Sequence, residues 1–145
     1  MSFYGFEKRF PPTKTVLPGV TTPQTLYRAL LACWCAETCA PRMRDRWTED
    51  DPTLGQCSVT AFLAQDLFGG EVYGIPRPDG SFHCYNVVHG RAFDLTSEQF
   101  HDEALDYSEN PLQRREEHFS KCEKYERYLL LRQRLEAWTG GKRNG

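Results

Sequence analysis

The sequence predicts an α+β fold in which a small antiparallel sheet is grouped between helices. Three observations lead to this fold class: a helical apolar pattern before residue 70, three short strand-like runs between residues 71 and 95, and a second helical pattern after residue 113. Because no helices separate the strand-like runs, they favour antiparallel pairing over alternating βαβ units. A chain of 145 residues has the size of one domain.

Four helical segments are expected. The first begins at a threonine cap at position 22 or 25 and ends near residue 39, before a proline. The second covers residues 57–68, where apolar residues recur at helical spacing and two glycines follow. A capping box at residues 96–99 indicates a short third helix. The fourth covers residues 113–138, and its expected apolar face consists of Tyr125, Tyr128, Leu129, Leu131, Leu135 and Trp138.

The remaining elements complete a single-domain organisation. Three strands are expected, at residues 71–75, 82–88 and 91–95. The N-terminal helices pack on this sheet, and the long C-terminal helix follows it. Four prolines in the first 23 residues indicate an extended arm. The predicted boundaries are an arm at 1–24, one domain at 25–139 and a flexible tail at 140–145.

Composition and charge exclude several classes of protein. The 18 basic and 20 acidic residues give a net charge of −2, which argues against generic binding to nucleic acids or anionic membranes. Only Arg77 and Arg91 supply fixed cations between residues 51 and 100, so a phosphate clamp is not expected there. The longest apolar run, Ala29–Ala36, is too short to cross a bilayer. Without a signal-peptide pattern, the sequence predicts a cytoplasmic protein whose six cysteines are thiols.

One combination of residues indicates thiol chemistry. Cys57 lies in the first turn of the second helix, His83 lies on a strand, and Asp94 lies on the next strand. The unpaired N–H groups at a helix start stabilise a thiolate, which is the nucleophilic form of cysteine. An imidazole can take the thiol proton and return it to a leaving group, while a carboxylate orients the ring. These residues are therefore the candidate nucleophile, general base and orienting acid.

The predicted hairpin places two of these residues together. If His89-Gly90 is a two-residue turn, alternation of side chains puts His83 and Asp94 on one face as diagonal neighbours. Cys84 and Asn86 then fall outside this constellation, and Cys84 is interpreted as buried filler. Gln56, next to the nucleophile, is a candidate donor to an oxyanion, together with the backbone N–H of Cys57.

Structural interpretations of the same residues stay open. Cys57 fits a small buried residue, His83 a strand histidine bonded to the backbone, and Asp94 a cap at a strand end. Cys35 and Cys39 are four residues apart, but the sequence offers no second pair of ligands at the spacing of structural zinc sites. They are interpreted as packing residues of one continuous helix that bind no metal and form no disulfide with each other.

The motifs around these residues resemble the YunG family of bacterial proteins. The resemblance rests on Gly55–Ala61 with Gln65–Glu71, on His83–Asn86 and on Phe93–Phe100. The order of a cysteine at a helix start, a histidine on a strand and an aspartate on the next strand is also similar to transglutaminase-like and papain-like thiol enzymes. The resemblance implies a compact papain-like or transglutaminase-like fold and names no substrate.

Two functions from different classes follow. The first is a cysteine-dependent hydrolase or acyltransferase that acts on an amide bond of a peptide or small molecule, with Cys57, His83 and Asp94 as catalytic residues and with no cofactor. The second is a non-catalytic binding module that retains the fold. The reactivity of Cys57 distinguishes the two. The sequence leaves the oligomeric state open.

Overall fold

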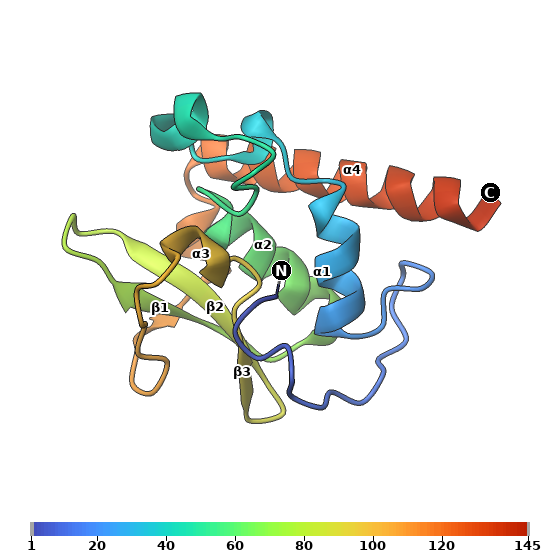
Figure 1. Cartoon of the computed structure of the whole chain (residues 1–145), viewed down its shortest axis with the longest axis horizontal. Coiled ribbons are helices and arrows are strands. Elements are labelled where there is room, and N and C mark those ends of the chain that lie inside the picture. The colour runs from blue at the N-terminus through green and yellow to red at the C-terminus, as the bar shows by residue number, and fades with distance from the viewer. Residues whose placement is uncertain (1, 145) are drawn as a thin grey trace.

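The computed structural model describes the backbone of residues 2–144 and the side chains of residues 2–140, and it has a mixed α+β architecture (Figure 1). The helices are α1 (Pro23–Leu31), α2 (Cys57–Phe68), α3 (Arg115–His118) and α4 (Cys122–Asn144). The strands are β1 (Glu71–Pro76), β2 (Phe82–Val88), β3 (Arg91–Phe93) and β4 (Leu112–Gln113). Three 3₁₀ segments, η1 (Ala36–Thr38), η2 (Pro41–Arg46) and η3 (Ser97–Phe100), lie between them.

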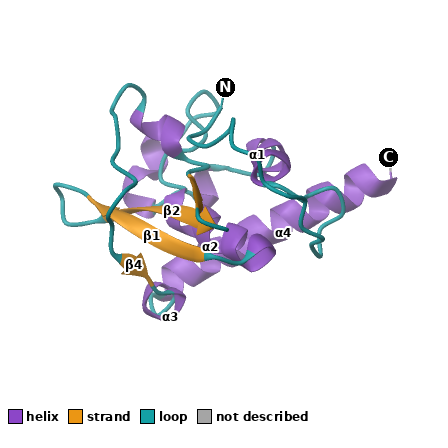
Figure 2. Ribbon diagram, turned by 90° about the horizontal axis from the view of Figure 1, so that it is seen from below, coloured by secondary structure: helices purple, strands orange, loops and turns teal. Residues whose placement is uncertain are grey.

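The strands form an antiparallel sheet in the order β3-β2-β1-β4. Figure 2 shows β2, β1 and β4 of this sheet in that order. The predicted register of the β2–β3 hairpin is confirmed, since Val88 pairs with Arg91 and Asn86 with Phe93. The strand predicted at 91–95 is shorter than expected: β3 ends at Phe93, because Asp94 forms its bridge with Tyr4 of the N-terminal arm instead of with β2. The edge strand β4 was not predicted, because two residues carry no alternating pattern.

Helix α2 lies at the centre of the fold, between the sheet and α4 (Figure 1). Most of its side chains are buried, because one side of the helix faces β2 and another faces α4. The glycine pair after Phe68 ends the helix as predicted, and both glycines have positive φ. This arrangement holds the first residue of α2, Cys57, against the start of β2.

The first helix differs from its prediction. Helix α1 ends at Leu31 instead of continuing to residue 39, so the segment with Cys35 and Cys39 is not one continuous helix. Tertiary contacts replace helical ones here: Arg134 Nε donates to the carbonyl of Cys33 at 2.6 Å, and the Trp34 indole donates to Thr60 Oγ1 at 2.9 Å. The helical spacing of this apolar segment therefore reflects core packing after the helix has ended.

The packing of the arm and of the C-terminal segment also differs from what the sequence pattern predicts. Phe3, Leu17 and Val20 of the arm are buried in the main core. The predicted helix at 113–138 is divided into α3 and α4, and Tyr125 and Leu129 are 44% and 40% exposed, which removes them from the expected apolar face. Helix α4 continues to Asn144 through most of the segment predicted as a tail. Gly145 and the side chains after residue 140 lie outside the described residues.

Candidate active site

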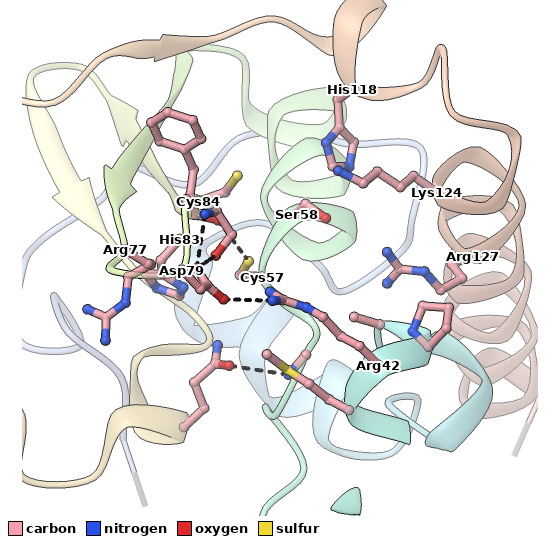
Figure 3. Close-up of a pocket in the computed structure, with 18 of the residues that line it drawn as sticks. Arg42, Cys57, Ser58, Arg77, Asp79, His83, Cys84, His118, Lys124 and Arg127 are labelled. Carbon is pink, nitrogen blue, oxygen red and sulfur yellow. Dashed lines mark hydrogen bonds and ion pairs between the residues drawn. The ribbon is translucent and has the colours of Figure 1, made fainter. Parts of the chain in front are cut away.

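The fold brings the three predicted residues to one place, at the start of α2 and beside the sheet. Figure 3 shows two of them, Cys57 and His83. Cys57 is the first residue of α2, His83 is the second residue of β2, and Asp94 directly follows β3. Because β3 pairs with β2 only as far as Asn86, the first residues of β2 have no strand partner on that side. The Cys57 sulfur lies at this edge, 3.9 Å from the carbonyl oxygen of Phe82.

A buried ion pair joins His83 and Asp94. The imidazole Nε2 lies 2.6 Å from Asp94 Oδ2, and both side chains are almost fully buried. The Tyr107 hydroxyl donates to the same oxygen at 2.7 Å, and the backbone N–H of Thr96 donates to Oδ1 at 3.2 Å. Donors from three different segments therefore converge on this carboxylate and fix its position behind the ring.

This charge determines the protonation of His83. Burial of the ring opposes protonation, but the Asp94 carboxylate outweighs it and raises the pKa of His83 to about 10. The imidazole and the Phe100 ring pack edge to face at a centroid distance of 4.5 Å, which restricts rotation of the imidazole. Since Nε2 is bound to Asp94, the other ring nitrogen, Nδ1, is left for the interaction with the Cys57 thiol.

The Cys57 thiol is surrounded by groups that favour the thiolate. The neighbouring Cys84, through its thiol and its backbone, and the His83 imidazolium lower the pKa of Cys57 well below its ordinary value, against the opposing effect of burial. The partial positive charge at the start of α2 acts in the same direction. Cys57 is partly exposed, so its sulfur combines a stabilised negative charge with access from the surface.

A cleft of about 980 Å³ opens beside this sulfur. One wall is formed by the β1–β2 hairpin, and the opposite wall is formed by η2 and by the residues from α3 to the start of α4 (Figure 3). Several cations line it, but Arg42 pairs with Asp79, and Arg127 pairs with Glu123. Among the described residues, Lys121 and Lys124 form no ion pair, so they give the second wall a net positive charge.

His118 lies on the same wall and differs from His83 in its protonation state. Burial and the nearby Lys124 lower its pKa to about 4, so the ring is neutral at pH 7. Its Nε2 is buried without a hydrogen-bond partner among the described residues. Burial also lowers the pKa of Lys124, whose side chain extends toward His118 in Figure 3. This wall therefore combines a neutral imidazole with a lysine whose charged form is disfavoured by burial.

The side chain of Gln56 does not occupy the position predicted for an oxyanion donor. It is fully buried, it is absent from the cleft lining, and its Nε2 donates to the carbonyl of Cys35 at 3.0 Å. The residue that caps α2 thus anchors the preceding segment. Asn86, excluded from the site by register, donates from Nδ2 to the carbonyl of Ala61 at 2.8 Å and ties β2 to α2.

Sequence reasoning missed several residues around the site. Cys84 is buried in an apolar cluster, as predicted, but it also lines the cleft with Cys57, which the sequence pattern does not indicate. Phe100 and Tyr107, which hold His83 and Asp94, come from connecting segments that carry no periodic pattern. Lys124 gave no signal either, because it lies in a charged helical segment.

The structure also bears on metals and membranes. Cys35 and Cys39 are free thiols. Among residues 2–140, the structure contains no group of three or more histidine, cysteine, aspartate or glutamate side chains placed to hold a metal ion. Within the same residues, no helix combines the length and the apolar character needed to cross a membrane.

Comparisons with known proteins identify relatives but no solved fold. The model of the family described as YunG protein matches residues 22–140, which include all the candidate site residues. A protein of Bacillus subtilis (strain 168) described as "Uncharacterized protein YunG" is 42% identical over 88 residues, which cover 61% of this chain and 73% of the relative. No solved structure matches the chain significantly.

Proposed function

Because the chain belongs to the YunG family, for which the matched relative names no activity, the function has to be argued from the site itself. We propose that the protein is a cysteine-dependent hydrolase or acyltransferase that acts on an amide bond, with a compact papain-like or transglutaminase-like catalytic core. The observation that carries this proposal is the buried His83–Asp94 pair at 2.6 Å beside the partly exposed Cys57 thiol.

In the proposed reaction, the Cys57 thiolate attacks the amide carbonyl carbon and forms a C–S bond. The carbonyl oxygen becomes an oxyanion, and the N–H groups of the first turn of α2 are its donors, since they have no acceptor within the helix. This assigns the oxyanion role to backbone groups in place of the Gln56 side chain, which is bound to Cys35.

His83 transfers the proton that the leaving group needs. The pKa of about 10 keeps the ring protonated at pH 7, so Nδ1–H donates its proton as the C–N bond breaks and the amine departs. The resulting thioester on Cys57 is then attacked by water or by an amine, and neutral His83 removes the proton of that second nucleophile. Asp94 orients the ring throughout and stabilises the imidazolium.

The cleft restricts the class of substrate. A volume of about 980 Å³ accommodates a small molecule or a short segment of peptide. We propose that the substrate amide also carries an anionic group, because Lys121 and Lys124 contribute positive charge without acidic partners among the described residues. The six free thiols favour a reducing, cytoplasmic location for this chemistry.

The test is turnover of a defined panel of amides, half of them carrying a carboxylate, by the reduced protein. Release of amine is followed together with the mass of the intact protein, which detects an acyl group on Cys57. We expect Cys57→Ala and His83→Ala to abolish release and Cys35→Ser, which alters a thiol outside the cleft, to retain it. Binding of these amides without acylation or release would refute the enzyme and favour a non-catalytic binding module.

A further inference from the structure

Cys57 has a second thiol as its neighbour. Cys84 lies on β2 on the face that packs against α2, and Cys57 packs against the same apolar cluster of which Cys84 is a member. Both residues line the cleft, and none of the other cysteines shares it with them. Figure 3 shows the two sulfur atoms on the same side of the cleft. The two cysteines are 27 positions apart in sequence and lie on different elements.

The acyl-transfer chemistry described above does not require a thiol at position 84. His83 supplies the proton, Asp94 orients the ring, and Cys57 is the nucleophile. The other four cysteines are placed elsewhere, since none of them lines the cleft. The structure therefore contains one pair of thiols at the reactive centre whose second member has no assigned use.

We propose that Cys57 and Cys84 form a peroxide-responsive dithiol, in which oxidation of Cys57 is captured by Cys84 as a reversible disulfide that blocks the cleft thiol. The partners of this chemistry are a hydroperoxide as the oxidant and a dithiol as the reductant. The proposal does not depend on amide hydrolysis, because it needs only a reactive thiolate and an adjacent thiol.

The proposed redox cycle of Cys57 and Cys84 has three steps. The Cys57 thiolate attacks the outer oxygen of the hydroperoxide, so an S–O bond forms, the O–O bond breaks, and sulfur is oxidised to sulfenic acid while the peroxide is reduced. The departing alkoxide, or hydroxide from hydrogen peroxide, takes up a proton. The Cys84 sulfur then attacks the Cys57 sulfur, so an S–S bond forms, the S–O bond breaks, and the Cys84 proton leaves with hydroxide as water.

The third step returns the protein to its starting state. A dithiol attacks the disulfide and leaves as its own cyclic disulfide, and its two protons restore the thiols of Cys57 and Cys84. Without a resolving thiol, a sulfenic acid proceeds to sulfinic acid, which a dithiol does not reduce. The proposed role of Cys84 is therefore to convert the sulfenic acid of Cys57 into a disulfide, which a dithiol can reduce.

The experiment uses the full-length protein, reduced and then treated with hydrogen peroxide near neutral pH, followed by alkylation and digestion without reduction. Trypsin leaves both cysteines in one peptide, because Arg77 precedes a proline and no other cleavage site lies between Trp47 and Arg91. Cleavage after glutamate separates them, since Glu71 lies between Cys57 and Cys84. We expect a linked pair of peptides in wild-type protein that dithiothreitol separates.

Two variants complete the design. In Cys84→Ser, the linked peptides are lost and sulfinic acid accumulates on Cys57, whereas Cys35→Ser retains the link. The wild-type digestion is decisive by itself if the Cys84 variant does not fold. The proposal is overturned if wild-type Cys57 becomes sulfinic acid without a link to Cys84, if it links to another cysteine, or if it remains reduced while other thiols are oxidised.

Discussion

The substitution Asp94→Asn tests the electrostatic basis of the site. It keeps an oxygen that can accept from His83 Nε2 and removes the negative charge 2.6 Å from the ring. In the wild-type protein the pKa of His83 is about 10 against an ordinary value of 6.5, a difference of about 5 kcal/mol in favour of the imidazolium. Burial remains in the variant and opposes protonation, so we expect the pKa of His83 to fall below 6.5.

The direct assay is a titration of the histidine rings by NMR, with the His83 signals assigned from a His83→Ala spectrum. Wild-type His83 should remain protonated to about pH 10, and the variant should hold a neutral ring at pH 7. His118 serves as an internal reference, because its pKa is lowered to about 4 and its ring should be neutral at pH 7 in both proteins. Asp79→Asn is the matched control, since this cleft carboxylate pairs with Arg42.

The same change should reach the nucleophile. With a neutral His83, the Cys57 thiolate loses its cationic partner, so the midpoint of its pH-dependent alkylation should move upward. The midpoint is a better measure than the rate at one pH, because a thiolate of lower pKa is also intrinsically less nucleophilic. His83→Ala should move it at least as far. Wild-type His83 that titrates near 6.5, or an unchanged Cys57 midpoint in Asp94→Asn, would refute the reasoning.

Three further predictions concern stability and substrate binding. The pKa of His83 is higher in the folded state than in the unfolded state, so protonation of the ring stabilises the fold fully below pH 6.5, and this contribution is lost as the pH rises through about 10. In urea unfolding, the difference in the free energy of unfolding between wild type and Asp94→Asn should therefore shrink across that range. Gly55→Ala should destabilise the fold by about 2 kcal/mol or more, because φ is +69° and the new methyl would lie 2.5 Å from Cys39 Sγ, whereas Gly80→Ala, at φ +88° in open space, should cost only about 1 kcal/mol in the same assay. If the substrate carries a carboxylate, Lys124→Met should raise KM for it with little change in kcat and leave a neutral amide unaffected, and equal losses for both amides would contradict the proposed anion contact.

The sequence predicted the parts of the site that follow from the spacing of apolar residues and from the residues that form turns. A two-residue turn fixes the register of a hairpin, and this was sufficient to place His83 and Asp94 within contact distance. The glycines after Phe68 and the apolar spacing before them located α2, and thereby Cys57 at its first turn. These predictions succeeded because each depends on local backbone geometry.

The failures share a different physical origin. The apolar spacing continues past Leu31 and predicts a longer helix α1, but Cys33 and Trp34 are held by Arg134 and Thr60, which are distant in sequence. Helical spacing alone predicts that Tyr125 and Leu129 belong to the core, but both are exposed on α4, which begins at Cys122 after a break. Tertiary contacts of this kind have no local signature, and a period alone does not show which elements cover a helix.

One structural cause explains why three separate segments meet at the site. Because β3 ends at Phe93, the backbone of Asp94 is free to donate to the carbonyl of Tyr4 in the arm, and the start of β2 is left with an open edge. That open edge admits the Cys57 sulfur, so side chains from both faces of β2 reach it.

The arm completes the same arrangement from the other side. The Tyr4 ring stacks on Tyr107 at a centroid distance of 3.9 Å, and the Tyr107 hydroxyl is one of the donors to the Asp94 carboxylate. A β3 that continued to residue 95, as the sequence pattern suggests, would pair Asp94 with Tyr85 across the hairpin and take its backbone away from Tyr4. The early end of this strand therefore leaves Asp94 to the arm, where Tyr4 stacks on the tyrosine whose hydroxyl donates to the carboxylate facing His83.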